Sequence, residues 1–320
     1  SLGRTYSGYW RGDSLRRGRL RAKEGTYEGL FNRRMEEHGE GEFMAYDGGY
    51  YVGKWKDGRR DGFGFSVAPH EVVKCGVWAK GRFRGEQMLY HSERIYGIDI
   101  SKYQHKHRHR TYGIDWRNLR ITRLGHTADR NALGADYPVS FVYIKSTEGL
   151  TVFNPYYTQD VRAARRYGFP VGAYHFFSTR PAMCQADYFL KKSRLRKGDL
   201  PPMLDVELSD RRIAAMGGRD VLFREMLVWL KEVGRRSGTT PIIYVSQDFV
   251  NRYMPFAPEE LKKYPVWVAR YGEYKPYVHL LYWQLSPDGR VRGIRGDVDI
   301  DVFNGSEEQF KRYLRTQTVK

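Results

Sequence analysis

The stretch Leu204-Asp205-Val206-Glu207 is a short apolar, β-prone run that ends on carboxylates. Two other runs have the same character, Gly97-Ile98-Asp99-Ile100-Ser101 and Val298-Asp299-Ile300. Because side chains alternate between the faces of a strand, Asp205 and Glu207 should point to the same side, roughly 6.5–7 Å apart at the backbone. Two carboxyl groups at about that separation can flank a glycosidic bond. Three such runs in one chain favour a catalytic site over buried Asp–Arg pairs or strand-end turns.

Around these runs, from Ile95 onward, strand-like segments alternate with helical ones. The strand candidates are residues 95–100, 139–145, 171–177, 202–207, 241–246, 266–270, 280–285 and 298–303. Helices are expected over residues 154–168, 181–195 and 220–236, the first with Asn154 as N-cap and Pro155 at the first helical position. The last three strand candidates leave little room for helices. The pattern predicts an α/β fold, a TIM-like (β/α)5(β)3 barrel over residues 95–320.

Chemistry in such barrels takes place at the carboxyl ends of the strands. Asp99, Lys145, His175, Glu207 and Asp299 all lie at or near those ends. Crowded carboxylates raise one another's pKa, which is what a general acid needs in order to keep its proton. We expect Lys145 to pair with a site carboxylate, whereas His175 fits a hydrogen-bonded structural role as well as a role in the site.

The residues before this region repeat. Gly8, Gly29, Gly53 and Gly76 follow one another after 21, 24 and 23 residues, each within an aromatic-rich segment. Turn signals such as Lys56-Asp57-Gly58 come after the aromatic residues. Alternating aromatic and polar residues around an Asp-Gly turn are typical of β-hairpins, and hairpins stacked at a fixed period bury their rings against their neighbours. Residues 1–94 are therefore predicted to form a small all-β hairpin-repeat domain.

The composition restricts the partners. The chain has 320 residues, of which 41% are hydrophobic, and its net charge is +18, with +5 in residues 1–94 and +13 in residues 95–320. No run of consecutive Lys and Arg resembles a nucleic-acid tail, so we expect no nucleic-acid partner. An anionic wall polymer or membrane fits this charge. The basic loop of residues 105–110 is expected to be solvated near such a polymer rather than to bind metal.

Other elements carry less information. Cys75 and Cys184 have no metal-ligand spacing and are expected to be buried, unreactive thiols. No apolar run is long enough to span a membrane. The chain opens at Ser1-Leu2-Gly3 without Met, so the lack of a visible signal peptide does not decide the compartment.

Two resemblances follow from these motifs. Residues 5–86 resemble MORN repeats, with 51–64 the clearest unit. Residues 96–310 resemble glycoside hydrolase family 25, the lysozymes that cleave peptidoglycan as N-acetylmuramidases. The motifs that carry this second resemblance are Gly97–Gln104, Phe141–Gly149, Val171–Phe176, Leu204–Glu207, Pro241–Tyr244, Trp267–Tyr271, Tyr282–Gln284 and Val298–Phe303.

The family resemblance implies roles for particular residues. Glu207 would be the catalytic acid, and Asp205 would position the 2-acetamido group of the substrate or its developing charge. Asp99 and Asp299 would be the other two active-site carboxylates. Six further residues would bind substrate: Tyr174, Tyr244, Trp283, Lys145, Gln284 and Trp267. Trp267 fits the barrel core as well as the groove wall, and neither a cofactor nor a metal ion is required.

The sequence departs from the family pattern in three places. The loop of residues 105–110 is longer and more basic than usual, and residues 123–137 resemble an insertion. Asp301 stands where the family usually has Asn, which adds a carboxylate close to Asp299. None of these departures removes a proposed catalytic residue.

The sequence thus predicts a muramidase that cleaves the β-1,4 bond between N-acetylmuramic acid and N-acetylglucosamine in peptidoglycan. The alternative is a catalytically inactive wall-binding or scaffold protein in which the repeats form the interaction module. We expect a monomer that is secreted or located in the cell envelope. Through the repeats, a membrane surface or a protein is a second candidate partner.

Overall fold

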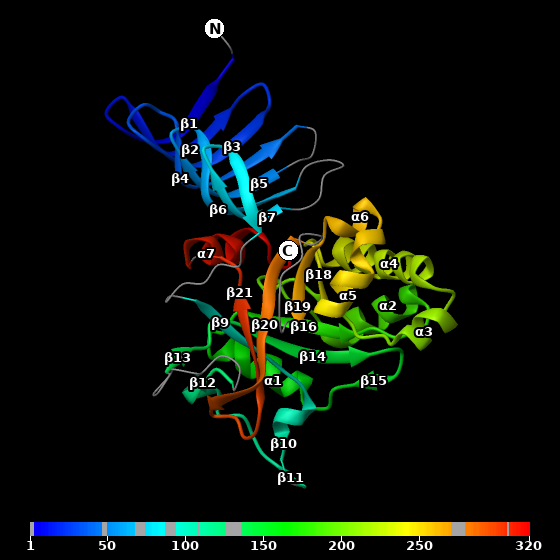
Figure 1. The fold of residues 1–320 in the computed structure, drawn as a ribbon. Coiled ribbons are helices and arrows are strands. Elements are labelled where there is room, and N and C mark those ends of the chain that lie inside the picture. Colours follow the sequence, from blue (N-terminus) through cyan, green and yellow to red (C-terminus); the bar gives the residue numbers. More distant parts are fainter. Residues whose placement is uncertain are drawn as a thin grey trace. The chain divides into compact units, whose positions relative to one another are not determined.

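The computed structural model describes residues 3–46, 50–67, 74–86, 94–107, 109–125, 136–269, 279–305 and 307–320. They fall into two compact units, one made of the described residues up to 86 and the other of those from 94 onward, except for His279 (Figure 1). In the described part of the chain, no helix is both long and apolar enough to cross a membrane. The expected boundary at residue 94 stays a prediction, because residues 87–93 lie outside the described part.

The first unit is an eight-stranded antiparallel sheet in which each strand pairs with the next one in sequence. Its strands are β1 (Thr5–Arg11), β2 (Ser14–Arg21), β3 (Gly25–Phe31), β4 (Glu37–Ala45), β5 (Tyr50–Lys56), β6 (Arg59–Val67), β7 (Lys74–Ala79) and β8 (Arg82–Glu86). The expected all-β architecture is confirmed. The structure does not test the finer assignment of these hairpins to MORN repeats.

The repeated glycines make room for the repeated tyrosines. A Cβ atom on Gly41 would lie 2.3 Å from the hydroxyl of Tyr27 and 2.4–2.5 Å from its ring, and one on Gly64 would lie 2.5 Å from the hydroxyl of Tyr51. Tyr27 and Tyr51 therefore lie over the glycines of their own hairpins, and each donates its hydroxyl hydrogen to the backbone carbonyl three residues on, at 2.8 and 2.9 Å. Cβ atoms on the periodic glycines Gly29 and Gly53 would likewise lie 2.4 and 2.8 Å from the hydroxyls of Tyr27 and Tyr51, so this packing accounts for the glycines at both positions.

Edge-to-face ring contacts join successive hairpins. Trp55 meets Tyr27 and Tyr51 with ring centroids 5.2 Å apart in both cases, and Tyr51 meets Trp78 at 5.1 Å. All four rings are buried. Aromatic pairs of this geometry stabilise by about 0.5–1.5 kcal/mol beyond the area they bury, so the ladder links hairpins that would be marginal alone.

The second unit contains a closed barrel of eight strands. In chain order they are β9 (Ile95–Ile100), β14 (Val142–Glu148), β16 (Val171–Phe176), β17 (Met203–Val206), β18 (Ile242–Ser246), β19 (Pro265–Ala269), β20 (His279–Arg292) and β21 (Val298–Phe303). Each overlaps one of the eight predicted strands. The six from β9 to β19 run parallel and are buried on both faces, which explains their nearly continuous apolar sequence. β20 and β21 are antiparallel and close the barrel against β9.

Helices fill four of the connections between parallel strands. They are α1 (Tyr157–Arg166), α2 (Ala182–Ser193), α3 (Asp210–Ala215), α4 (Arg219–Ser237), α5 (Gln247–Arg252) and α6 (Glu259–Lys262), and α7 (Glu307–Thr316) follows the last strand. The three predicted helices correspond to α1, α2 and α4. The first begins three residues after Asn154, whose carbonyl accepts a turn hydrogen bond from the Tyr157 backbone at 3.1 Å.

The connection from β9 to β14 differs from the other four. Its described residues form 3-10 turns and short strands: η1 (Lys102–His105), β10 (Lys106–His107), β11 (Arg110–Thr111), η2 (Trp116–Asn118), β12 (Arg120–Arg123) and β13 (Tyr137–Pro138). The remaining short elements are β15 (Val152–Phe153), after β14, and η3 (Met254–Phe256), after α5. The predicted insertion at 123–137 falls largely on residues 126–135, outside the described part. The barrel is therefore confirmed, whereas the exact (β/α)5(β)3 formula stays a prediction.

The expectation for Cys184 was wrong. This thiol is exposed, because the buried side of α2 is formed by residues at helical spacing around it, such as Ala182, Gln185, Ala186 and Phe189. The side chain of Cys75 lies outside the described part.

Candidate active site

The register of the barrel shows which side chains share its interior. Cross-strand partners point to the same face of a sheet. Asp99 on β9 pairs with Asp299 on β21 and with Tyr143 on β14. Tyr143 is fully buried, in one cluster with residues of every other strand of the barrel. Asp99 and Asp299 therefore face the barrel interior, near the carboxyl end of β9.

The same reasoning places the motif around β17. Asp205 pairs with Phe176 on β16 and with Tyr244 on β18, and Tyr244 pairs in turn with Trp267 on β19. Asp205 is 7% exposed and points into the interior. Glu207 is exposed and lies one residue beyond the end of β17, at the mouth of the barrel.

These carboxyl groups are close enough to change one another's ionisation. Burial raises the pKa of Asp99 well above its ordinary value, and the charges of Asp299, Asp301, Asp205 and Glu207 raise it further. Burial raises the pKa of Asp299 to about 7, with Glu207 contributing. Repulsion of this kind keeps a proton on part of the cluster.

The two carboxyl groups of the central motif have different surroundings. Burial and then Glu207 raise the pKa of Asp205 well above its ordinary value, and its Oδ1 atom has no hydrogen-bond partner among the residues that the structure describes. Desolvation raises the pKa of Glu207, and Lys145 opposes that rise. A carboxyl group at the mouth of the site with a raised pKa can give a proton to a leaving oxygen. A buried partner suits the stabilisation of developing charge.

Lys145 is a cation close enough to this motif to lower the pKa of both its carboxyl groups. Its Nζ atom lies 2.8 Å from Glu148 Oε2 and 4.4 Å from the ring centre of Phe176. Lys145 therefore forms its ion pair with Glu148, which was not one of the predicted site carboxylates. On Asp205 and Glu207 its charge acts only by lowering their pKa.

Replacing Lys145 with Met should move the alkaline limb of the rate profile to higher pH. Without the cation, the pKa of Glu207 rises, so the acid keeps its proton further into the alkaline range. The pH dependence of kcat/KM measures this. Lys231→Met, at the opposite end of the barrel, is the matched control. An alkaline limb that moves to lower pH in Lys145→Met would contradict the assignment.

Three of the predicted substrate-binding residues lie with the carboxylates. Tyr174 and Tyr244 are 7% and 8% exposed, and the hydroxyl of Tyr244 donates to Gln284 Oε1 at 3.1 Å. Gln284 pairs with Asp301 across β20 and β21, so it also faces the interior. Polar groups that reach a mostly buried site in this way can fix the orientation of a sugar.

Two predicted substrate-binding residues are not brought to the site. Trp283 pairs with Val302, on the opposite face of β20 from Gln284, and is buried there. Because strand faces alternate, the neighbour of an inward residue must point outward. Trp267 faces inward but is fully buried, and it stacks on Tyr282 with ring centroids 4.8 Å apart. It belongs to the core and leaves no surface for a sugar.

Both histidines discussed above are structural. His175 is buried with its ring nitrogens 2.7 Å from Thr147 Oγ1 and 3.1 Å from Gln185 Oε1, and burial lowers its pKa to about 4. His105, expected in a solvated loop, is buried as well, with Nε2 2.7 Å from Asp160 Oδ2. It anchors the loop to α1, whereas Lys106 and Arg110 are exposed as expected.

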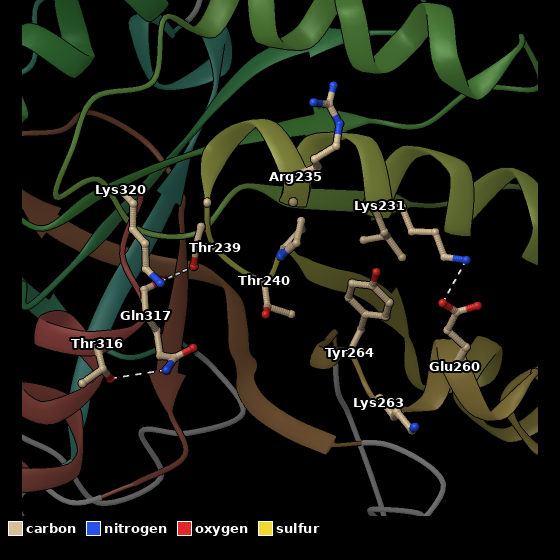
Figure 2. A pocket seen from close by; sticks show the side chains of 14 residues that line it. Lys231, Arg235, Thr239, Thr240, Glu260, Lys263, Tyr264, Thr316, Gln317 and Lys320 are labelled. Atoms are coloured by element: carbon tan, nitrogen blue, oxygen red, sulfur yellow. Dashed lines mark hydrogen bonds and ion pairs between the residues drawn. The ribbon is translucent and has the colours of Figure 1, made fainter. Parts of the chain in front are cut away.

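A hollow of about 680 Å³ lies at the other end of the strands (Figure 2). Pro241 and Tyr264, which line it, precede β18 and β19, so it opens at the amino ends, away from the carboxylates. Lys231 and Arg235 in its wall pair with Glu260 and Glu232. These cations lie near the carboxyl end of α4, where they complement the helix dipole. In barrels of this kind that end serves stability rather than chemistry.

Asp301 was expected to add a carboxylate close to Asp299, but it was not among the predicted site residues. The structure places it in the interior, two residues after Asp299 on the same face of β21. The signal for it was the spacing of two in the run Asp299-Ile300-Asp301, which puts both carboxyl groups on one side of a strand.

The arrangement defines a class of enzyme. Several ionisable carboxyl groups gather at the carboxyl ends of parallel barrel strands, and one of them is exposed beside a buried partner. Acid/base cleavage of glycosidic bonds requires such a pair.

Comparison with known proteins agrees with this class of enzyme. The model of glycosyl hydrolases family 25 matches residues 98–294, which include Asp99, Asp205 and Glu207 but end before Asp299. The chain belongs to this family and is a glycoside hydrolase of the muramidase class.

Two relatives show how far the similarity extends. The uncharacterized protein YegX of Escherichia coli O157:H7 is 33% identical over 224 residues, which are 69% of this chain and 73% of YegX. Lysozyme M1 of Streptomyces globisporus is 29% identical over 228 residues, 66% of this chain and 68% of the relative.

Solved structures share the fold. The bacterial lysozyme from Streptomyces coelicolor aligns with a TM-score of 0.55 and 26% identity, covering 68% of this chain and 96% of that one. A family 25 glycosyl hydrolase from Bacillus anthracis aligns with a TM-score of 0.54 and 24% identity, covering 72% and 99%.

Proposed function

We propose that this protein is a peptidoglycan hydrolase that cleaves the β-1,4 bond between N-acetylmuramic acid and N-acetylglucosamine. The observation that carries the proposal is the pair at the end of β17, the exposed Glu207 next to the buried Asp205, each with a raised pKa. The relatives add support, because Lysozyme M1 and the Streptomyces coelicolor protein are both lysozymes by name.

In this proposal Glu207 protonates the leaving oxygen, and Asp205 assists the 2-acetamido group as positive charge develops on the sugar. Asp99 and Asp299 complete the negative site around that charge. The sugar rings are held by the predicted contacts Tyr174, Tyr244 and Gln284, and by Lys145 at the rim. Carboxyl groups and water suffice for this chemistry.

The direct test is the product. Purified sacculi digested by the enzyme should release new reducing ends, and mass spectrometry of the soluble fragments should find them on N-acetylmuramic acid. Reducing ends on N-acetylglucosamine would identify a glucosaminidase instead. The alternative function, an inactive wall-binding protein, predicts binding to sacculi with no new reducing ends. The mutual pKa effects of Asp99, Asp205, Glu207 and Asp299 favour the enzyme.

We further propose that residues 1–94 form a separable MORN-like module that guides a (β/α)5(β)3 barrel to the wall or its membrane. A secreted or envelope location and a monomeric state accompany this proposal. The aromatic ladder makes the module a unit with its own core, since Tyr27, Tyr51, Trp55 and Trp78 contact one another.

A chain that begins near Ser92 should fold and cleave soluble muropeptide chains as the full protein does. The barrel has its own buried core and all the proposed catalytic residues. Activity on whole sacculi should fall, because the guiding module is gone. Turnover of both substrates by the two chains measures this. Failure of the shortened chain to fold would show that the parts share a core.

Binding to sacculi should weaken with salt. Attraction between exposed charges is screened within about 8 Å at physiological ionic strength. Changing the exposed Lys106 and Arg110 to Ser should reduce low-salt binding by up to about tenfold, as expected for two surface charges. Turnover of a short neutral oligosaccharide should stay unchanged. Equal loss on both substrates would make the loop part of the catalytic architecture.

A further inference from the structure

Asp301 is a fifth carboxyl group, set deeper in the barrel than the others. On β21 it pairs with Gly97 of β9, whereas Asp299 pairs with Asp99. Gly97 lies two residues before Asp99, so Asp301 occupies the next inward layer, toward the amino end of β9. Its side chain is completely buried.

No group in the described part of the barrel hydrogen-bonds the carboxyl oxygens of Asp301. Gly97 has no side chain to offer, and the amide of Gln284, whose Oε1 accepts from Tyr244, makes no hydrogen bond to Asp301 among the described residues. The Trp267 indole and the Asp99 backbone lie close enough to lower the pKa of Asp301, yet neither has hydrogen-bond geometry. An unpartnered carboxylate in such a place is very unfavourable, and the usual response is to bind a proton.

We propose that Asp301 is a positioning residue of the hydrolytic site, a carboxyl group that exchanges a proton inside the barrel and thereby sets how much negative charge Asp99 and Asp299 carry together. This inference rests on the proposed function, because it takes Asp99 and Asp299 as members of the hydrolytic site. Asp301 does not touch the substrate. It acts through the two carboxyl groups above it.

The electrostatic surroundings of Asp301 agree with this proposal. Burial raises the pKa of Asp301 well above its ordinary value, and Asp299 raises it further. Asp301 in turn raises the pKa of Asp99 and of Tyr244. Among the described residues, the ionisable groups with a raised pKa at inward positions of the barrel strands are Asp99 (β9), Tyr143 (β14), Tyr174 (β16), Asp205 (β17), Tyr244 (β18), Tyr282 (β20) and Asp299 (β21), with Glu207 one residue beyond β17. Lys145 on β14 adds a positive charge at the mouth of the site. Groups coupled this closely titrate as a set.

The test is Asp301→Asn, which keeps the shape and removes the ionisable group. Carbon-13 labelling of aspartate carboxyl groups and NMR titration follow Asp99 and Asp299 directly. Asp99, and with it the summed titration of the pair, should move to lower pH in the variant, for Asp99 by at least about half a unit for a charge this near in a protein interior. Unchanged titration of the pair overturns the proposal. If the Asn variant does not fold, Asp301→Ser gives the same test.

The second readout is the pH dependence of kcat and kcat/KM on a soluble substrate. The profile of Asp301→Asn should move to lower pH as a whole, because the groups that govern it lose a neighbouring negative charge. Asp199→Asn is the matched control: this carboxyl group is also buried, but it pairs with Arg165 near the amino end of β17. The Asp199→Asn substitution should lower the stability of the fold without moving the pH profile of the rate. A profile that moves equally in both variants makes Asp301 merely structural and overturns the proposal.

The two readouts separate this inference from the proposed function. If the parent protein releases no reducing ends from peptidoglycan, the proposed function fails, and the NMR titration still decides whether Asp301 controls the pair. If the parent is active and the titration of Asp99 and Asp299 does not move, the function stands and the inference about Asp301 fails.

Discussion

Replacing Glu207 with Gln should lower the rate of sacculus hydrolysis by about 10²–10⁴-fold, the usual contribution of one acid–base group. Gln has the same shape but has no carboxyl proton to give to the leaving oxygen. Because Glu207 is exposed and lies beyond the end of β17, the change should leave the melting temperature nearly unaltered. Turbidity clearance and reducing-end release measure the rate, and pull-down with sacculi measures the binding that should persist.

Glu260→Gln is the matched control for this change. Glu260 is also exposed, but it pairs with Lys231 at the amino ends of the strands. The Glu260→Gln variant should hydrolyse sacculi at the parent rate. If Glu207→Gln also clears a wall suspension at the parent rate, Glu207 is not the acid and the proposed mechanism is lost.

Asp205→Asn should lower kcat by about 10²–10³-fold, the cost of removing one preorganised electrostatic contribution. The same change should stabilise the folded chain at neutral pH. The pKa of Asp205 is raised in the folded state, so its penalty is absent below the ordinary pKa of aspartate and grows as pH rises toward the folded value. Thermal unfolding at acidic and neutral pH measures this, with the gain expected only at neutral pH.

Opposite changes in activity and stability distinguish a catalytic carboxyl group from a structural one. Asp199→Asn again serves as control, because it breaks an ion pair with Arg165 at 2.5 Å and should lose stability while turnover persists. If Asp205→Asn loses stability at neutral pH and keeps its kcat, Asp205 belongs to the scaffold.

Much of the barrel could be predicted because its signals are local. Short apolar runs bounded by turn residues mark the eight strands, and the carboxylates at their ends stand out against that background. The helices of 10 residues or more between the strands, α1, α2 and α4, were predicted, although α1 begins at Tyr157 rather than at the predicted Pro155 and is capped by Tyr156 rather than by Asn154. Short helices such as α3, α5 and α6 have too few turns for a periodic signal, and α7 was not predicted either.

The contacts between distant segments could not be predicted in the same way. Trp283 and Gln284 are adjacent in sequence, and only the pairing of β20 with β21 decides which of them faces the carboxylates. His105 reads as part of a basic, solvated loop, yet Asp160, 55 residues away, draws it into a buried pair.

The sequence by itself determined the two kinds of architecture, the ends of strands where chemistry takes place, and Asp99, Asp205, Glu207 and Asp299 as candidates. These depend on residue type, spacing of two and turn chemistry, which are properties of short segments. Only the tertiary structure decided that Asp301 is completely buried beside them, that Trp267 is core and that Lys145 meets Glu148. Each of those depends on closure of the barrel, because burial and charge coupling arise from strands far apart in the chain.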